Sequence, residues 1–324
     1  ALNMFACYSY TSFISDFFIT FPFLIGSIPI RHRCYKFNIP LQFLAYPKCG
    51  STLKIQDMVI EYNSVCSGHI SCSCGYFANI KEGIIITPHI DQHAQVWYTL
   101  DTIIKTISSD YMNLLFKSYE WMYDNLSTEN LDNKTFFCLG ESGAEFIYEY
   151  INKLGPNNHY IIYDVAAETI QIAKKRLDAL GSDYKILYLV GYADQLPLKS
   201  SCVDVFIDDC SSFFDLFDGG GFLIEKIKHL LNTKTIISGL FLSYAKDAPT
   251  LNNIPLYWPH ALTGSMNFNI FKNNLQENLF SIIDSKKQGE SGVPGYWPNF
   301  HGPNDQISFN TYFAKHSLKK NSFL

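Results

Sequence analysis

Short, continuous apolar runs recur through the second half of the chain, at residues 136–139, 160–163, 184–190, 202–207 and 235–242. Runs of this length without polar interruption are typical of strands that are buried on both faces of a sheet. Segments with helical spacing lie between them, and the clearest, residues 166–180, carries its apolar side chains on one face. Regular alternation of strand and helix predicts an α/β fold with a doubly wound, mainly parallel sheet.

The end of the chain departs from this alternation. A helix is predicted at residues 222–231, and the last apolar run, residues 307–314, alternates with a period of two. That period is typical of an antiparallel strand. We therefore expect residues 307–314 to add an antiparallel strand at the edge of the sheet.

The first strand–helix–strand unit, residues 135–164, carries the clearest functional pattern. A strand is followed by a turn with Gly140 and Gly143, a helix over residues 144–153, a second strand and the terminal acid Asp164. Glycines allow a ligand to approach the backbone, and an acid at this strand end can accept hydrogen bonds from both hydroxyls of a ribose. The pattern fits a nicotinamide cofactor and an adenosylmethionine cofactor equally well.

Acidic residues also follow the third and fourth predicted strands. Asp194 lies just beyond the third strand, where its carboxylate can accept the amine of an adenine, and residues 196–198 can form an apolar wall under that ring. Asp208 and Asp209 end the fourth strand. This acidic pair is either a solvated strand end or a general base beside the reacting group.

Residues 46–87 have the layout of a small metal-binding β domain. Cys49 with Gly50, and Cys72 with Cys74, resemble the two cysteine knuckles of a zinc ribbon, in which four thiolates hold one zinc. Tyr46 stands where the first knuckle would carry its other cysteine. The nearby Cys66 and His69 are the candidates for the fourth ligand, so the predicted metal ligands are Cys49, Cys66, Cys72 and Cys74. A ribbon that has lost its metal is the alternative.

Two further segments complete the domain organisation. Residues 1–45 form an apolar extension of unknown role, and its most apolar part, residues 17–30, is short for a membrane span and contains two prolines. Residues 88–134 are expected to be a helical connector with a broad apolar stripe, leading into the main domain at residues 135–324. Neither a membrane role nor a secretory signal is expected.

Composition adds limits on partners and location. The 324 residues carry a formal net charge of −5, so no overall basic field favours a large nucleic-acid footprint. The nine cysteines are odd in number and unevenly spread, which favours a reducing, cytoplasmic environment over a secreted disulfide framework.

Three segments together resemble class I S-adenosylmethionine-dependent methyltransferases. They are the acid Asp164 after the second strand, the D-x-L-P sequence that begins at Asp194, and the V-D-V-F-I-D strand at residues 203–208. A preceding ribbon and helical connector are similar to those of ribosomal-RNA guanine methyltransferases. The phrase GYFANIKEGIIIT is similar to methyltransferase domains fused to MerR-type regulators. The resemblance implies a Rossmann-like, seven-stranded sheet with a small N-terminal zinc-ribbon-like β domain.

The resemblance also implies the cofactor, S-adenosyl-L-methionine, and the residues that hold it. Gly140 and Gly143 would approach its methionine part, and Asp208 would lie at the mouth where the methyl group is transferred. The first loop departs from the E-x-G-x-G-x-G pattern, because Cys138, Ser142 and Ala144 replace the acid and two glycines. The predicted cofactor-binding residues are Gly140, Glu141, Gly143, Asp164, Val165, Ala193, Asp194 and Asp208.

The sequence therefore predicts a methyltransferase that acts on an unidentified RNA base or small molecule, with Asp208 and Asp209 as catalytic candidates. The altered loop keeps a second interpretation open, a non-catalytic sensor or regulatory module that binds the same cofactor. A dinucleotide-dependent oxidoreductase is a third and weaker alternative.

Overall fold

The computed structural model describes residues 43–46, 49–51, 53–61, 64–88, 107–181, 184–212, 215, 221–259, 261, 264–292, 301–302 and 304–317. The chain divides into two compact units. The first, Ala1–Arg33, lies outside the described residues, as does nearly all of the predicted apolar extension. All elements described here belong to the second unit, Cys34–Leu324.

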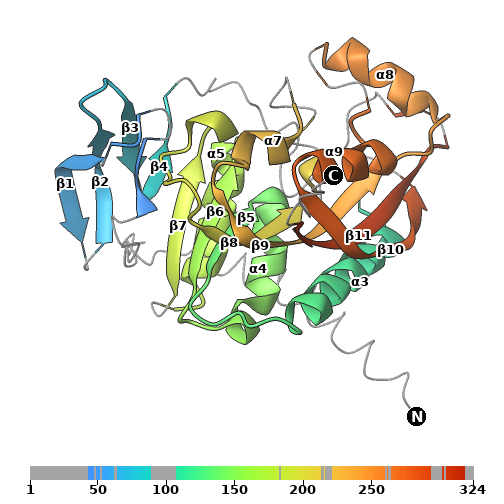
Figure 1. Cartoon of the computed structure of the whole chain (residues 1–324), viewed down its shortest axis with the longest axis horizontal. Coiled ribbons are helices and arrows are strands. Elements are labelled where there is room, and N and C mark those ends of the chain that lie inside the picture. The colour runs from blue at the N-terminus through green and yellow to red at the C-terminus, as the bar shows by residue number, and fades with distance from the viewer. Residues whose placement is uncertain are drawn as a thin grey trace, which may run out of the picture. The chain divides into compact units, whose positions relative to one another are not determined.

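One mixed sheet of 11 strands runs through the described part of the chain (Figure 1). Its spatial order is β1-β2-β3-β4-β7-β6-β5-β8-β9-β11-β10. The strands are β1 (Lys54–Glu61), β2 (Ser64–Ser71), β3 (Phe77–Lys81), β4 (Ile84–Ile86), β5 (Thr135–Leu139), β6 (His159–Asp164), β7 (Lys185–Val190), β8 (Val203–Asp209), β9 (Leu231–Ser243), β10 (Phe280–Gly292) and β11 (Gln306–His316).

The centre of the sheet is parallel, as the apolar runs predict. Strands β7, β6, β5, β8 and β9 pair in parallel with one another, in this order. The chain builds outwards from β5 to β6 and β7 on one side, then returns to place β8 and β9 on the other. The order therefore reverses between β5 and β8, which is the switch point of a doubly wound sheet.

The last strand is inside the sheet, so the expected position of residues 307–314 at the edge is wrong. Strand β11 is antiparallel, as predicted, but it pairs with β9 on one side and with β10 on the other. Strand β10 takes the edge and is largely exposed. Because its sequence is mostly polar, as suits an edge strand, it gives no apolar run that marks it as a strand.

Helices cover both faces of the sheet. Helix α4 begins at Glu141, three residues before the predicted start, and α7 is shorter than expected because β9 already begins at Leu231. The elements are α3 (Ser109–Leu126), α4 (Glu141–Leu154), α5 (Ala167–Asp178), α7 (Leu223–Ile227), α8 (Pro249–Tyr257), α9 (Phe268–Glu277) and the short 3₁₀ helix η2 (Ala193–Gln195).

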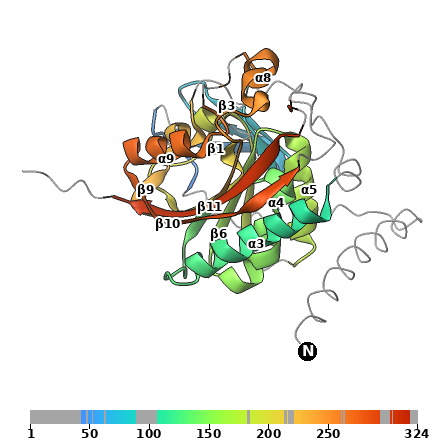
Figure 2. The ribbon, with the colours of Figure 1, turned by 90° about the vertical axis from the view of Figure 1, so that its right-hand side faces the viewer.

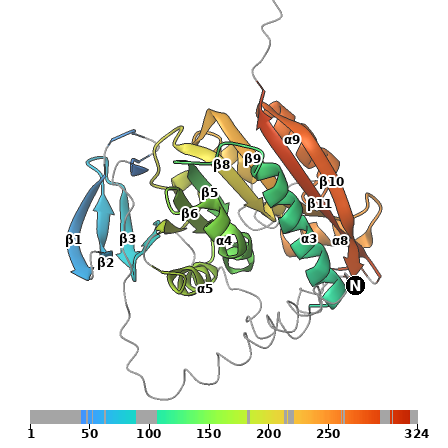
Figure 3. The ribbon, with the colours of Figure 1, turned by 90° about the horizontal axis from the view of Figure 1, so that it is seen from below.

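The side chains of β5 divide between two apolar cores. Phe136 and Cys138 point to the core built with α3, α4 and α5, whereas Phe137 and Leu139 point to the core built with α7 and α9. Figure 3 shows α3, α4 and α5 together on one side of the sheet. Every residue of β5 is buried, which explains why its sequence is continuously apolar.

Helix α3 confirms the helix predicted within residues 88–134. Its predicted stripe is buried, with the exception of Trp121, which is partly covered. Figure 2 shows α3 running alongside the β10–β11 hairpin, against which it packs. The hydroxyl of Ser108 caps its first turn by accepting a hydrogen bond from the Tyr111 amide at 3.1 Å.

The ribbon-like segment extends the main sheet. Strands β1 to β4 form an antiparallel series, and β4 pairs in parallel with β7, with Ile84 opposite Tyr188 and Ile86 opposite Val190. The predicted boundaries at residues 46–87, 88–134 and 135–324 stay an interpretation of the sequence. Among the described residues, no helix combines the length and apolar character required to cross a membrane.

Candidate functional site

The candidate site lies where the central parallel strands end. Parallel strands present their carboxyl ends at one edge, and ligands of doubly wound sheets bind there, beside the switch point. In this chain the switch point lies between β5 and β8. The residues that follow β5, end β6, follow β7 and end β8 are therefore the ones to consider.

Several buried polar atoms at this edge have no hydrogen-bond partner among the described residues. A buried polar atom without a partner costs roughly 1–3 kcal/mol, so a group of them at one edge indicates a place for a polar ligand. Sequence reasoning singled out only the acid at the end of β6. The atoms are Thr87 Oγ1 after β4, Asp164 Oδ2 at the end of β6, and Ser212 Oγ and Asp215 Oδ2 after β8.

Asp164 is the predicted ribose-binding acid, and its two oxygens differ. Its Oδ1 accepts a hydrogen bond from the Ala166 amide at 2.8 Å, whereas Oδ2 is buried without a partner among the described residues. The side chain is 4% exposed. Burial raises the pKa of Asp164 to about 7, and the amides of Val165 and Ala166 oppose that rise. Two donated hydrogen bonds at Oδ2 would complete this carboxylate.

Gly140 brings the end of β5 close to this acid. Its amide donates to the Tyr163 carbonyl at 2.7 Å, and a Cβ at this position would lie 3.3 Å from the Asp164 Cβ and 3.0 Å from Ile170 Cδ1. A side chain here would therefore crowd the acid. The backbones of Glu141 and Gly143 lie in the first turn of α4, and the side chain of Glu141 lies outside the described part.

Ala144 shows how the altered glycine loop is accommodated. It occupies a position where the resemblance has glycine, and its backbone has a φ of 59°. This left-handed conformation costs a residue with a Cβ roughly 1–2 kcal/mol. Ala144 is 1% exposed, so surrounding packing holds it there. Ala144 therefore adopts a backbone conformation that glycine adopts most easily.

The turn after β7 places the predicted adenine-side residues. Ala193 and Asp194 lie in η2, with Ala193 buried and Asp194 exposed. Leu196 and Leu198 are 0% exposed and belong to the core under α7, so they support the turn from below. Val165 lies half-buried beside the end of β6.

Asp208 is turned inwards at the end of β8. Its oxygens accept hydrogen bonds from the Ser211 amide and hydroxyl, each at 2.8 Å, and from the Tyr312 hydroxyl of β11. Gly239 of β9 makes room for this contact, because a Cβ there would lie 2.7 Å from Asp208 Cβ and from Tyr312 Cε1. Burial raises the pKa of Asp208 to about 6.

Asp209 is buried on the opposite face. The Tyr119 hydroxyl of α3 donates to its two oxygens at 3.0 and 3.2 Å, and the Cys210 thiol lies 3.6 Å from Oδ1. Burial raises the pKa of Asp209 to about 7. A general base must reach its substrate, whereas Asp208 and Asp209 are 0% and 1% exposed and hold internal donors. This geometry favours a role for both in positioning the strand end.

Cys138 stands where the resembled loop has an acid, and Glu145 of α4 is an acid on the same side of the sheet. Cys138 is fully buried, and both its burial and Asp209 raise the pKa of its thiol. Glu145 of α4 is 8% exposed and pairs through Oε2 with Arg176 of α5. Its Oε1 is buried without a partner among the described residues.

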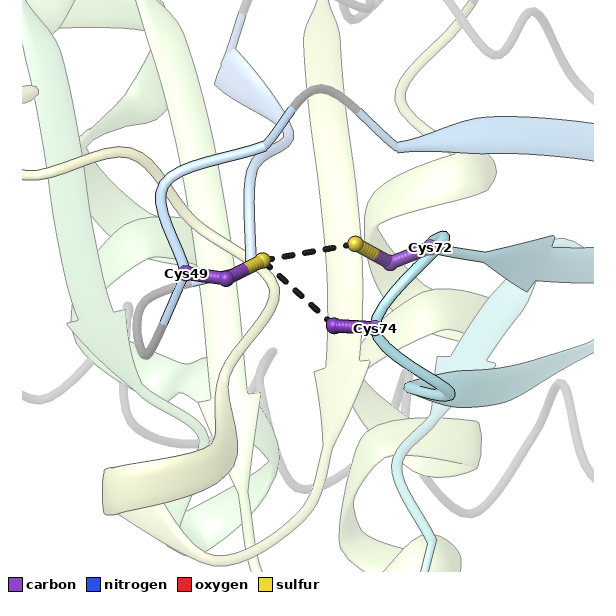
Figure 4. Close-up of side chains that lie close together, drawn as sticks. All are labelled: Cys49, Cys72 and Cys74. Atoms are coloured by element: carbon purple, nitrogen blue, oxygen red, sulfur yellow. Dashed lines mark hydrogen bonds between the residues drawn. The ribbon is translucent and has the colours of Figure 1, made fainter.

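Three of the four predicted metal ligands lie together at the other end of the sheet. The Cys49 sulfur lies 3.4 Å from the sulfurs of both Cys72 and Cys74 (Figure 4). Cys49 follows the first knuckle turn, Cys72 follows β2, and Cys74 lies in the turn before β3. The sequence therefore identifies a real cluster of thiols.

Neither candidate for the fourth ligand joins this cluster. Cys66 of β2 is buried and forms a disulfide, so its sulfur is not available as the predicted metal ligand. His69 of β2 points to β1 instead, with Nε2 2.9 Å from Gln56 Oε1 and Nδ1 3.4 Å from Asp57 Oδ2. Spacing along the chain placed both residues nearby, but the pleat of β2 directs them elsewhere.

The aromatic loops near the C-terminus are only partly described. Trp258 packs partly buried against the core, and His301 lies 2.7 Å from the Tyr244 hydroxyl. Burial lowers the pKa of His301 to about 4. His260 and Trp297, in the same two loops, lie outside the described residues.

The fold is similar to several solved structures. One is the MccD protein, with a TM-score of 0.48 and 12% identity over 62% of this chain and 96% of that one. Another is geranyl diphosphate C-methyltransferase from Streptomyces coelicolor A3(2), with Mg2+, geranyl-S-thiolodiphosphate and S-adenosyl-L-homocysteine, at a TM-score of 0.47 and 10% identity over 64% and 81%. A third is the [4+2]-cyclase SpnF, at 0.43 and 13% over 62% and 81%.

These similarities concern the fold, which serves a methyltransferase and a cyclase in two of these structures, and they assign no activity to this chain. The sequence matches no protein-family model and no curated protein.

Replacing Ala144 by glycine should stabilise the protein. Glycine removes the left-handed strain but loses more chain entropy on folding, so we expect a net gain of about 0.5–1 kcal/mol in the free energy of unfolding. Ala173→Gly, in the middle of α5, is the matched control and should lose about 1 kcal/mol. Urea denaturation measures both. A loss of similar size at Ala144 would show that its backbone is ordinarily helical.

Replacing Asp209 by asparagine should reduce the pH dependence of stability. Its folded-state pKa is raised to about 7. The unfolded side chain loses its proton near pH 4, so the free energy of unfolding should fall as pH rises from about 4 to 7. Asp209→Asn should make this fall shallower in urea denaturation at pH 5.0, 6.0 and 7.5. Asp284→Asn, at an exposed carboxylate, should leave it unchanged. An unaltered slope in Asp209→Asn would contradict the assignment.

Proposed function

We propose that this chain binds S-adenosyl-L-methionine at the carboxyl edge of its parallel strands and transfers the methyl group to an acceptor. The main support for the proposal is the position of Asp164 and the state of its carboxylate. Asp164 ends β6, next to the strand that opens the glycine turn, and its Oδ2 is buried without a partner among the described residues. The two hydroxyls of a ribose supply the donors that such an oxygen lacks.

The surroundings of Asp164 fit a nucleoside. Gly140 leaves the space beside the acid that a side chain would fill. The Gly191 amide donates to the Asp164 carbonyl at 3.2 Å, which ties the turn after β7 to the same strand end. Asp194, exposed in that turn, is free to accept the exocyclic amine of an adenine. The ribose and adenine contacts therefore come from adjacent strand ends.

The chemistry requires little beyond positioning. When bound, the cofactor would supply an electrophilic methyl group on a sulfonium. The acceptor would attack this methyl carbon in line, and the bond from the methyl group to sulfur would break, leaving S-adenosylhomocysteine. Holding the two reactants in that geometry contributes most of the rate, and no general base need be present. The internal hydrogen bonds of Asp208 and Asp209 suit this requirement, because they fix the end of β8 beside the switch point. In this proposal both residues act as positioning residues.

The acceptor is an RNA base or a small molecule. The net charge of −5 favours an acceptor with a small footprint, since a large RNA surface needs many lysine or arginine contacts. Thr87 Oγ1, Ser212 Oγ and Asp215 Oδ2 offer buried polar positions around the same edge. They would supply hydrogen bonds to a polar acceptor.

A second candidate is a non-catalytic module that binds the cofactor and reports its level. The loop after β5 favours it, because Ala144 holds a strained glycine conformation and Cys138 replaces the acid. Both candidates need the same cofactor site, so cofactor binding tests the shared claim and turnover separates them. A dinucleotide-dependent oxidoreductase is tested in the same experiment with nicotinamide cofactors.

Asp164→Asn should weaken binding of S-adenosylmethionine by about tenfold or more. The asparagine side chain has one acceptor oxygen where the carboxylate has two, so it accepts fewer hydrogen bonds from the ribose hydroxyls. Isothermal calorimetry with S-adenosylmethionine, S-adenosylhomocysteine and NADH measures this. Asp204→Asn, at the amino end of β8, is the matched control, since its carboxylate serves the Thr135 amide at 3.0 Å. No binding by the unaltered protein, or equal binding by Asp164→Asn, would contradict the proposal.

The pH dependence of this binding follows from the same acid. The pKa of Asp164 is raised to about 7, and the ionised form accepts both ribose hydroxyls. The affinity for the cofactor should therefore rise by at most about tenfold per pH unit until the pH reaches about 7. Above that pH it should stay constant. Turnover is measured as S-adenosylhomocysteine formed with RNA and small-molecule fractions. Tight binding without turnover in either fraction would favour the sensor.

A further inference from the structure

The cysteine cluster does not fit the four-thiolate zinc that a zinc ribbon holds. Structural zinc sites are closed by four protein ligands in a tetrahedron. Cys49, Cys72 and Cys74 form a group whose ligand atoms all lie within 4.8 Å of one another, and no histidine, aspartate, glutamate or further cysteine of the described chain completes it. The described residues supply three corners of a tetrahedron and leave the fourth without a protein ligand.

The three sulfurs converge from two separate turns. Cys49 is 23 positions from Cys72 and 25 from Cys74 along the chain, yet its sulfur lies 3.4 Å from each of theirs. Figure 4 shows the side chains of the two turns pointing at one another. Zinc–sulfur bonds of about 2.3 Å place tetrahedral sulfurs about 3.8 Å apart, so this arrangement needs little adjustment to hold one ion.

Aromatic packing replaces the missing bond at the fourth corner. The ring of Tyr46 stacks on that of Tyr76, with centroids 4.2 Å apart and an interplanar angle of 26°. The knuckle turn is closed by the Gly50 amide, which donates to the Tyr46 carbonyl at 2.8 Å, and by the Tyr46 amide, which donates to Ser51 at 3.3 Å. The turn therefore keeps its shape without a fourth thiolate.

The cluster is also open to water. Cys49 and Cys74 are exposed and Cys72 is partly exposed. A three-thiolate site with one solvent-facing corner is the arrangement in which a metal keeps an exchangeable water. Thiolate ligands select thiophilic ions such as zinc over hard cations.

We propose that Cys49, Cys72 and Cys74 bind one zinc ion through three thiolates, with the fourth coordination position open to solvent. Binding forms three zinc–sulfur bonds and releases the three thiol protons to solvent, so affinity falls as the pH is lowered. The site is separate from the proposed cofactor site. It differs from a closed ribbon site because its metal exchanges readily and can accept an external ligand.

The test uses the full chain, reduced and freed of metal, with cobalt(II) as the probe. Its thiolate charge-transfer absorption reports cobalt–sulfur bonds. We expect one equivalent of cobalt(II) to bind and to give this absorption. Added zinc should displace the cobalt and remove the absorption. Cys49→Ser, Cys72→Ser and Cys74→Ser should each lower the affinity by about a hundredfold, while Cys202→Ser, a cysteine outside the cluster, should not. Circular dichroism checks that each variant is folded.

Two substitutions at Tyr46 test whether the fourth coordination position of the metal is open to solvent. Tyr46→Cys should close the site, raising zinc affinity by about a hundredfold and the cobalt–sulfur absorption by about one third, from three bonds to four. Tyr46→Phe keeps the stacking ring and should bind as the unaltered protein does. Loss of binding in Tyr46→Phe would make the phenolate a ligand and overturn the open corner. The absence of thiolate absorption in the reduced, unaltered protein would overturn the site itself.

Discussion

The burial of carboxylates at the carboxyl edge of the sheet is the constraint on which this structure depends. Burying an ionised carboxylate is costly unless donors surround it. Distant elements provide such donors for two of the acids. The Tyr119 hydroxyl of α3 donates a hydrogen bond to Asp209, and the Tyr312 hydroxyl of β11 donates one to Asp208. Asp164 receives hydrogen bonds from the local amides of Ala166 and Val165, and its Oδ2 has no partner among the described residues. In the proposed cofactor site, this remaining oxygen is the one that accepts hydrogen bonds from the ribose.

The ribbon-like segment and the proposed cofactor edge are in direct contact. Tyr76, which stacks on Tyr46 beside the thiol cluster, donates its hydroxyl hydrogen to the Gln195 carbonyl at 3.1 Å. The Ala45 amide donates to the Pro197 carbonyl at 3.2 Å, in the same turn after β7. The segment therefore supports the turn that carries Asp194, which gives β1 to β4 a structural purpose even if no metal is bound.

The sequence identified features that depend on local pattern and missed those that depend on distant partners. The run at residues 136–139 predicts a buried strand because every position of β5 is covered. Strand β10 escaped because an edge strand need not be apolar. The sequence also singled out Asp194 through the D-x-L-P motif and Cys49 through the pattern of cysteine knuckles. The tyrosine donors to Asp208 and Asp209 lie 104 and 90 residues away along the chain, at Tyr312 and Tyr119, so no spacing rule reveals them.

The central claim is that the free oxygen of Asp164 holds a ribose. The most direct measurement is a crystal structure of the protein soaked with S-adenosylhomocysteine, which is the product of methyl transfer and is chemically stable. The account predicts density at the ends of β5, β6 and β7, with both ribose hydroxyls within hydrogen-bonding distance of Asp164 Oδ2. Density for the nucleoside elsewhere, or a ribose that leaves Oδ2 without a donor, would contradict it.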